Sequence, residues 1–140
     1  MFLACFSSNL PALLSAKTNG VKLRAGPGTS YKQIMDLPKY YPLKITAKSG
    51  KWYKVVDWMN IRGWINSAQV SNQQTVTVRK WRVMLRSGPG IRYRKNASLY
   101  QGYILKVLKK YGNWYKVVVV DPPYMNQGWV YRQMVWGQAR

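Results

Sequence analysis

The 140-residue sequence contains no histidine, no glutamate and a single cysteine, Cys5. General acid–base and nucleophilic mechanisms draw mainly on these residue types, so the composition argues against an enzyme and predicts no catalytic residue. One cysteine cannot form an internal disulfide, and without histidine the chain lacks the usual ligands for a metal site. We therefore expect a core held together by packing alone, with neither a metal nor a cofactor.

Acidic residues are also scarce: only Asp36, Asp57 and Asp121 stand against 23 lysines and arginines, which gives a formal net charge of +20. Asp57 and Asp121 fall at turns, where aspartate usually accepts hydrogen bonds from its own backbone. The bases are spread along the chain and form no tail. Such a charge attracts polyanions in general, whether nucleic acids, lipid headgroups or acidic wall polymers. A compositional bias at solvent-facing positions explains the charge equally well.

The first 16 residues carry no charge, and the basic region starts abruptly at Lys17. This change is typical of the end of a secretory signal, with cleavage after Ala16, and we interpret residues 1–16 as a signal or an N-terminal extension. No stretch reaches the roughly 18 apolar residues of a membrane-spanning helix. We therefore expect an exported chain without a transmembrane span.

Three motifs occur twice, in the same order. The pairs are Leu23–Gly28 with Leu85–Gly90, Gly50–Val56 with Gly112–Val118, and Gly63–Ile65 with Gly128–Val130. The first two pairs are offset by 62 residues and the third by 65, which places a three-residue insertion in the second copy. A fixed period marks two copies of one module. We predict domains at residues 17–71 and 83–137, joined by a linker at residues 72–82.

Short apolar runs bounded by glycine and proline predict strands, and no window shows the 3.6-residue period of a helix. We expect an all-β fold with about five strands per module, and helix only as single turns at residues 67–70 and 132–135. The recurring apolar residues are assigned to the core. They are Leu23, Trp52, Val55 and Trp64 in the first copy and Leu85, Trp114, Val117 and Trp129 in the second.

The three ordered motifs, Leu-Arg-x-Gly-Pro-Gly-x-x-Tyr, Gly-x-Trp-Tyr-Lys-Val and Gly-Trp-Ile/Val, resemble the bacterial SH3-like (SH3b) domain in both copies. The tandem form is similar to exported SH3-like envelope proteins of alphaproteobacteria, and the resemblance covers residues 21–137. It implies two small SH3-like β-barrels in tandem, in the periplasm or outside the cell. Relatives on wall hydrolases bind peptidoglycan or its peptide stems, whereas many stand-alone members have no known ligand.

Aromatic residues beside basic ones are the candidates for ligand binding, because such surfaces stack on flat groups and pair with anions. Tyr53 and Tyr115 adjoin the core tryptophans and must point to the opposite face of their strands. The candidate set is Arg24, Tyr31, Tyr53, Lys54, Arg86, Tyr93, Tyr115 and Lys116. The glycines of each Gly-Pro-Gly are expected to take positive φ in a tight turn, and Trp81 is expected to cover the interface between the modules.

The leading hypothesis is a non-catalytic, exported module that binds an anionic cell-wall or envelope polymer, with peptidoglycan or its peptide stems as the partner suggested by the resemblance. A nucleic-acid-binding tandem barrel is the first alternative and rests on charge alone. A protein-interaction scaffold that takes a peptide segment beside Tyr31 or Tyr93 is the second.

Overall fold

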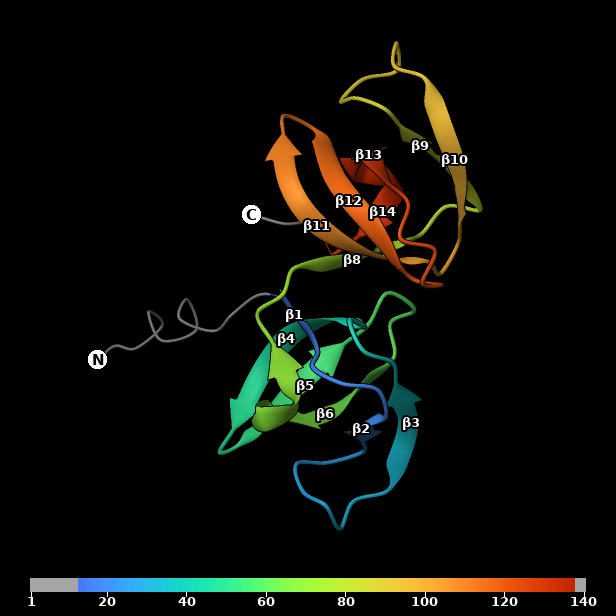
Figure 1. Ribbon diagram of the computed structural model, residues 1–140. Helices are drawn as coiled ribbons and strands as arrows, with labels where there is room; N and C mark the ends of the chain where they lie inside the picture. The colour runs from blue at the N-terminus through green and yellow to red at the C-terminus, as the bar shows by residue number, and fades with distance from the viewer. Residues whose placement is uncertain (1–12, 138–140) are drawn as a thin grey trace, which may run out of the picture.

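A computed structural model describes residues 13–137 of the chain, which form two antiparallel seven-stranded sheets and almost no helix. The sheets follow the same strand order and build two small barrels in tandem, as predicted, with seven strands each rather than the expected five. Figure 1 shows the barrels one above the other, the first coloured blue to green and the second yellow-green to red, with β8 of the second barrel nearest to β1 and β4 of the first. The two predicted helical turns are present as single 3-10 turns, η2 and η3.

Each barrel is named by the strands that build it. The first barrel contains β1 (Leu13–Ala16), β2 (Val21–Arg24), β3 (Gln33–Leu37), β4 (Pro42–Ser49), β5 (Trp52–Val56), β6 (Arg62–Asn66), η2 (Ser67–Gln69) and β7 (Val70–Ser71), in the sheet order β3-β2-β6-β5-β4-β1-β7. The second contains β8 (Thr75–Val78), β9 (Arg82–Arg86), β10 (Lys95–Tyr100), β11 (Ile104–Tyr111), β12 (Trp114–Asp121), β13 (Gln127–Tyr131), η3 (Arg132–Met134) and β14 (Val135–Trp136), in the order β10-β9-β13-β12-β11-β8-β14.

Strand β1 corrects the predicted domain boundary at residue 17. It pairs with β4 and β7 as β8 pairs with β11 and β14, and it stands 62 residues before β8, so the repeat already includes Leu13. Leu14, Ser15 and Ala16 are buried in the first barrel, and cleavage after Ala16 would remove a strand of the sheet. The two strands share burial and pairing but no identical residue, which is why motif matching missed them. The rest of the predicted signal, residues 1–12, lies outside the described residues.

Strand β8 corrects the predicted linker in the same way. It occupies residues 75–78, within the segment 72–82 assigned to the linker, and belongs to the sheet of the second barrel. Among the described residues, only Asn72, Gln73 and Gln74 stand between the last strand of one barrel and the first of the next.

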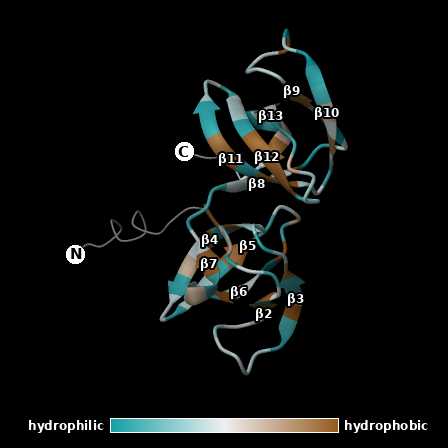
Figure 2. Cartoon of the chain, viewed as in Figure 1, coloured by the Kyte–Doolittle hydropathy of each residue, from teal (hydrophilic) through white to brown (hydrophobic). Residues whose placement is uncertain are grey.

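Branched aliphatic residues fill the two cores. Leu23 and Val55 lie in the first cluster and Leu85 and Val117 in the second, each at most 1% exposed. Figure 2 shows the same pattern along β11 and β12, which turn from hydrophobic at their middle to hydrophilic at the hairpin tip. Tyr41 and Tyr115 also belong to these clusters, whereas the four recurring tryptophans lie elsewhere.

The four tryptophans assigned to the core are half-buried and belong to neither cluster, so that prediction is wrong. They are Trp52, Trp64, Trp114 and Trp129. Side chains alternate along a strand, so the face of β12 that buries Val117 also buries Tyr115, while Trp114 lies on the opposite face. Tyr115 is 1% exposed. The prediction assigned Trp114 and Val117 to the core together, although residues three apart on a strand lie on opposite faces.

The barrels share a packed interface. Ile104, the first residue of β11, is 2% exposed and lies in the core cluster of the first barrel, where Trp58 also packs. The Thr75 hydroxyl donates to the Tyr40 carbonyl across 2.7 Å, which joins the start of β8 to the first barrel. Trp81 was expected to cover this interface, but it is 76% exposed, so that prediction is wrong. Ile104 fills the interface instead, because it follows the β10–β11 turn, where Gly102 lies beside Trp58 of the first barrel.

Candidate functional site

A groove on the second barrel has a volume of about 840 Å³. It lies between the β9–β10 loop, the outer face of β12 and β13, and the turn η3. Apolar side chains supply most of its lining, and three arginines also line it. Its lining residues are Arg82, Val83, Met84, Arg86, Pro89, Gly90, Ile91, Arg92, Tyr93, Trp114, Tyr131 and Met134.

An arginine at the end of β9 anchors the loop that forms one wall of the groove. The Arg86 Nη1 donates to the carbonyl oxygens of Ile91 and Tyr93, both at 3.1 Å. The equivalent Arg24 donates to Thr29 at 3.2 Å and to Tyr31 at 3.1 Å. Both arginines were proposed as ligand-binding residues, and the structure gives each a loop-anchoring contact.

The Gly-Pro-Gly motif is explained by a tyrosine ring rather than by backbone strain. None of its four glycines takes a positive φ, so that prediction is wrong. A Cβ placed on Gly88 would overlap the ring of Tyr93, and one on Gly26 would overlap Tyr31. The ring lies directly on the first glycine of each motif, as the spacing suggested. Tyr31 and Tyr93 are about half exposed, so one side of each ring packs on its loop while the rest reaches solvent.

The same groove in the first barrel is smaller and polar. Its volume is about 280 Å³, and it is lined by Lys22, Arg24, Thr29, Trp52, Asn66 and Gln69 among others. The equivalent residues in the second barrel are Met84, Arg86, Ile91, Trp114, Tyr131 and Met134. Four polar side chains of the first copy are thus replaced by methionine, isoleucine and tyrosine in the second. The two copies share a fold but differ in the chemistry of this surface.

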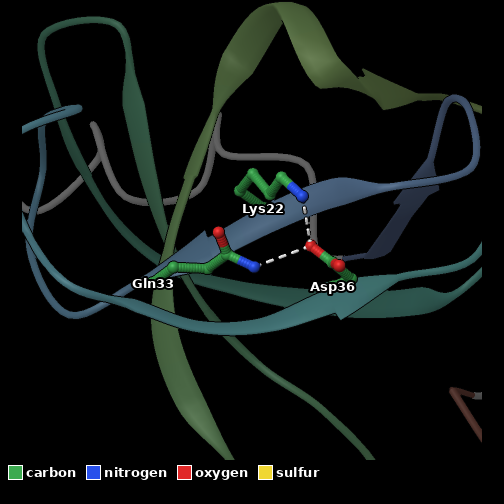
Figure 3. Close-up of polar contacts among 3 residues, drawn as sticks. All are labelled: Lys22, Gln33 and Asp36. Atoms are coloured by element: carbon green, nitrogen blue, oxygen red, sulfur yellow. Dashed lines mark hydrogen bonds and ion pairs between the residues drawn. The ribbon is translucent and has the colours of Figure 1, made fainter.

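An ion pair spans β2 and β3 beside the groove of the first barrel. Lys22 Nζ lies 2.6 Å from Asp36 Oδ1, which also accepts a hydrogen bond of 2.8 Å from Gln33 Nε2 (Figure 3). The second barrel has Met84 in place of Lys22 and Ser98 in place of Asp36, so it cannot form this pair. The groove of the second barrel is therefore lined by the apolar Met84 at the position where the first barrel has a lysine paired with an aspartate.

The remaining candidate residues lie on different faces of their strands. Tyr115 is buried, so it cannot contact a ligand and the prediction is wrong for this residue; Tyr53 packs against the first core and is half-buried. Lys54 is exposed, and Lys116 is half-buried directly across from Trp129 on β13. The groove therefore brings together Arg86 and Tyr93 from the predicted set, and no other member.

Motif matching missed the residues that distinguish the groove. Trp114 was assigned to the core, but it packs against Tyr131 with ring centroids 5.3 Å apart and lines the groove. Met84, Ile91 and Met134 belong to no repeated motif. A comparison of the two copies could have found these three residues, because each stands where the first copy has a polar residue.

The groove is electrostatically positive. Arg82, Arg86 and Arg92 line it, and none of Asp36, Asp57 and Asp121 does. Within the described part of the chain, no group of three histidine, cysteine, aspartate or glutamate side chains is placed to hold a metal ion. Among residues 13–137, no helix is long and apolar enough to cross a bilayer. An apolar floor with a cationic rim suits an uncharged side chain attached to an anionic group.

The strand order, the hairpins and the short 3-10 turn before the last strand define a pair of small SH3-like barrels in tandem. The sequence model of the bacterial SH3 domain matches the chain twice, over residues 19–71 and 81–135. The protein therefore belongs to the bacterial SH3 domain family and contains two copies of the domain.

One curated relative and several solved structures are similar to the chain. It is 26% identical over 111 residues to the protein named "Putative N-acetylmuramoyl-L-alanine amidase YrvJ" of Bacillus subtilis (strain 168), covering 71% of this chain and 21% of that protein. The chain thus spans about a fifth of that relative's length.

Two similar structures are an NlpC/P60 family protein from Bacillus cereus ATCC 10987 and NlpC2 from Trichomonas vaginalis. The first is 13% identical with a TM-score of 0.41, covering 88% of this chain and 55% of that one. The second is 14% identical with a TM-score of 0.39, covering 92% and 48%. With TM-scores this low, the family assignment rests on the sequence model.

Proposed function

We propose that this protein is a non-catalytic, exported binding module of the cell envelope that recognises peptidoglycan through its peptide stems. Membership of the bacterial SH3 domain family supports a binding role, and the relative named as an amidase supports a wall ligand. The matched region is a small part of that relative, so its enzymatic activity is not transferred to this chain.

The groove of the second barrel is the observation that carries this proposal. A stem peptide is short, bears small aliphatic side chains and carries free carboxylates. Met84, Trp114 and Met134 offer an apolar floor for the side chains, and Arg82 and Arg92 offer positive charge at the rim for carboxylates. The first barrel lacks the apolar floor, so we assign binding to the second barrel and a supporting role to the first.

The described acidic residues support a role without catalysis. Asp57 accepts backbone hydrogen bonds from Met59 and Ile61, and Asp36 pairs with Lys22, so both have structural partners. None of them lines the groove. A general acid or base needs an ionisable group within hydrogen-bond reach of the substrate, and the groove offers only arginines, Tyr93 and Tyr131.

A pull-down with purified sacculi tests the proposal with the full chain at physiological salt. We expect wild-type protein to be retained and Met84→Lys/Met134→Gln, which copies the polar groove of the first barrel, to lose at least tenfold in retention. The matched control is Lys22→Met/Gln69→Met, which makes the reverse changes in the first barrel and should be retained at least as well as wild type. Equal retention of wild type and the Met84→Lys/Met134→Gln variant overturns the groove assignment.

The net charge of +20 favours nucleic acid as a second candidate partner. Binding of this kind is driven by counterion release and weakens steeply with salt. Retention on sacculi that survives 0.5 M salt, together with release of DNA at that salt, supports the wall ligand. Release from sacculi at that salt, together with retention of DNA, overturns the wall ligand.

A further inference from the structure

Four aromatic rings form a continuous row on the surface of the second barrel. Ring centroids lie 6.0 Å apart for Trp81 and Tyr100, 5.8 Å for Tyr100 and Tyr103, and 6.2 Å for Tyr103 and Tyr124, with interplanar angles between 67° and 71°. The rings come from the β8–β9 connection, the end of β10, the β10–β11 turn and the β12–β13 loop, so the fold gathers them from four separate places. The connection that carries Trp81 runs past the lower end of β10 in Figure 1.

Packing accounts for only part of this row, because Tyr103 packs against the second core but the rings at the two ends do not. Trp81 is 76% exposed and Tyr124 is 64% exposed, and neither belongs to a core cluster or to the packed interface between the barrels. Contiguous exposed apolar surface in a small protein usually marks a binding site. Edge-to-face contacts hold the rings at fixed angles while leaving ring faces open to a ligand.

The row exists only in the second barrel. The residues equivalent to Trp81 and Tyr100 are Asn19 and Pro38, and Tyr124 follows Asp121 in the loop that carries the three-residue insertion. Tyr41, equivalent to Tyr103, is buried and bonded to Asp57 instead. The barrel with the apolar groove is therefore also the barrel with the aromatic row.

The row and the groove meet at Arg82. This residue lines the groove, follows Trp81 in the chain and pairs directly with Tyr100 across β9 and β10. A ligand that fills the groove and extends past Arg82 reaches the row next. The groove with its arginine rim suits a peptide, whereas the row offers ring faces and phenolic hydroxyls.

The chemistry of the row favours a sugar over a phosphate chain. The C–H face of a pyranose packs on an aromatic ring, and tyrosine hydroxyls bond to its hydroxyl groups. The four rings of the row carry no charge, whereas a phosphate backbone needs cations along its path.

We propose that the Trp81–Tyr124 row binds the glycan portion of the same ligand whose peptide occupies the groove, so that the second barrel recognises the junction of sugar and peptide. This inference rests on the proposed function, because it assumes that the groove binds the peptide. It adds a second subsite that has no counterpart in the first barrel.

Isothermal titration of the full chain with three probes tests this subsite: a disaccharide carrying a stem peptide, the peptide alone, and glycan chains stripped of peptide. We expect the disaccharide–peptide to bind at least tenfold more tightly than the peptide. Trp81→Ala/Tyr124→Ala should bind the disaccharide–peptide as weakly as the peptide and leave the peptide affinity unchanged. Tyr111→Ala, which removes an equally exposed tyrosine at a hairpin tip, is the matched control and should change neither affinity.

The outcomes separate this inference from the proposed function. Equal affinity of wild type and Trp81→Ala/Tyr124→Ala for the disaccharide–peptide overturns the subsite, even when the peptide alone binds. Absence of peptide binding overturns the groove assignment, even when stripped glycan binds to the row. Oligothymidine is a further probe of the row. If it binds more tightly than the disaccharide–peptide and loses that affinity in the Trp81→Ala/Tyr124→Ala variant, the row binds nucleic acid and not a sugar.

Discussion

Tyr41 donates its phenolic hydrogen to Asp57 Oδ2 over 2.6 Å, and both side chains are buried in the first barrel. The other oxygen, Oδ1, accepts the backbone N–H groups of Met59 at 3.0 Å and Ile61 at 2.8 Å. The carboxylate thus ties the residue before strand β4 to the turn after β5, and the tyrosine satisfies its second oxygen. The second barrel has Val119 in place of Asp57 and lacks this network.

Replacing Tyr41 by phenylalanine should destabilise the first barrel. The change removes one donor and leaves a buried carboxylate oxygen unsatisfied, which costs about 1–3 kcal/mol. Urea unfolding measures the loss, and Tyr111→Phe, at an exposed position, is the control with no expected change. Equal free energies of unfolding for Tyr41→Phe and wild type would show that water replaces the phenol.

The same residue predicts a loss of stability at high pH. Burial, and then the hydrogen bond and charge of Asp57, raise the pKa of Tyr41 well above its ordinary value of about 10. The folded state therefore holds this proton more tightly than the unfolded state. Its contribution is complete below pH 10 and declines as the pH rises through the raised pKa. Denaturant titrations between pH 9 and 11 should show a steeper decline for wild type than for Tyr41→Phe, and parallel curves would contradict this.

The ring of Tyr93 makes Gly88 irreplaceable. An alanine Cβ at Gly88 would overlap the ring, so Gly88→Ala should displace the loop and cost about 1–3 kcal/mol. Gly90→Ala is the matched control, because its Cβ would lie 3.4 Å from Tyr93 Cδ2, close to ordinary contact. Thermal melting compares the two, and Gly88→Ala/Tyr93→Ala should recover part of the loss. A Gly88→Ala protein as stable as Gly90→Ala would disprove the role of the ring.

Ile104 should couple the two barrels. Its side chain lies in the first core although its strand belongs to the second barrel, so Ile104→Ala should destabilise the first barrel by about 2–5 kcal/mol. Leu99→Ala, confined to the second core, is the control. Hydrogen exchange of amides in β2 and β5 should speed up in Ile104→Ala and not in Leu99→Ala. Unchanged exchange there would mean that the barrels fold independently.

A buried hydroxyl offers a route to a more stable protein. Thr77 Oγ1 has no hydrogen-bond partner in the described structure, whereas the equivalent Ser15 Oγ donates to the Gln73 carbonyl at 2.8 Å. Thr77→Val removes an unsatisfied polar group and should raise stability by about 1 kcal/mol. Ser15→Ala should lower it by a similar amount. Calorimetry measures both changes, and a destabilised Thr77→Val variant would point to a bound water at that hydroxyl.

Identities between the copies predicted the barrels but not their first strand. Leu23 with Leu85, and Gly50 with Gly112, fixed the period, and strand-like spacing gave the all-β class that the structure and the family model confirm. Strand β1 was missed because Leu13–Ala16 and Thr75–Val78 have no residue in common and are alike only in burial and pairing. Backbone pairing makes few demands on residue identity, so such a strand leaves no motif.

The candidate site was harder to predict because large aromatic residues were assigned to the core against the alternation of their strand. Trp114 and Tyr115 are both large and amphipathic, and only Val117, two residues after Tyr115, indicates that the tyrosine lies on the inner face. The groove residues Met84 and Met134 were visible as differences between copies, but a search for identities passes over them.

The short connection between the barrels would govern how the proposed binding module meets a wall polymer. With only Asn72, Gln73 and Gln74 between β7 and β8, and with Ile104 packed into the neighbouring core, the second barrel cannot sample a sphere around the first as a tethered domain does. Contacts made by the first barrel with a charged surface would then hold the groove at a fixed distance from that surface and in a fixed orientation. Lengthening this connection would let the second barrel change its orientation relative to the first, without altering a single residue of the groove.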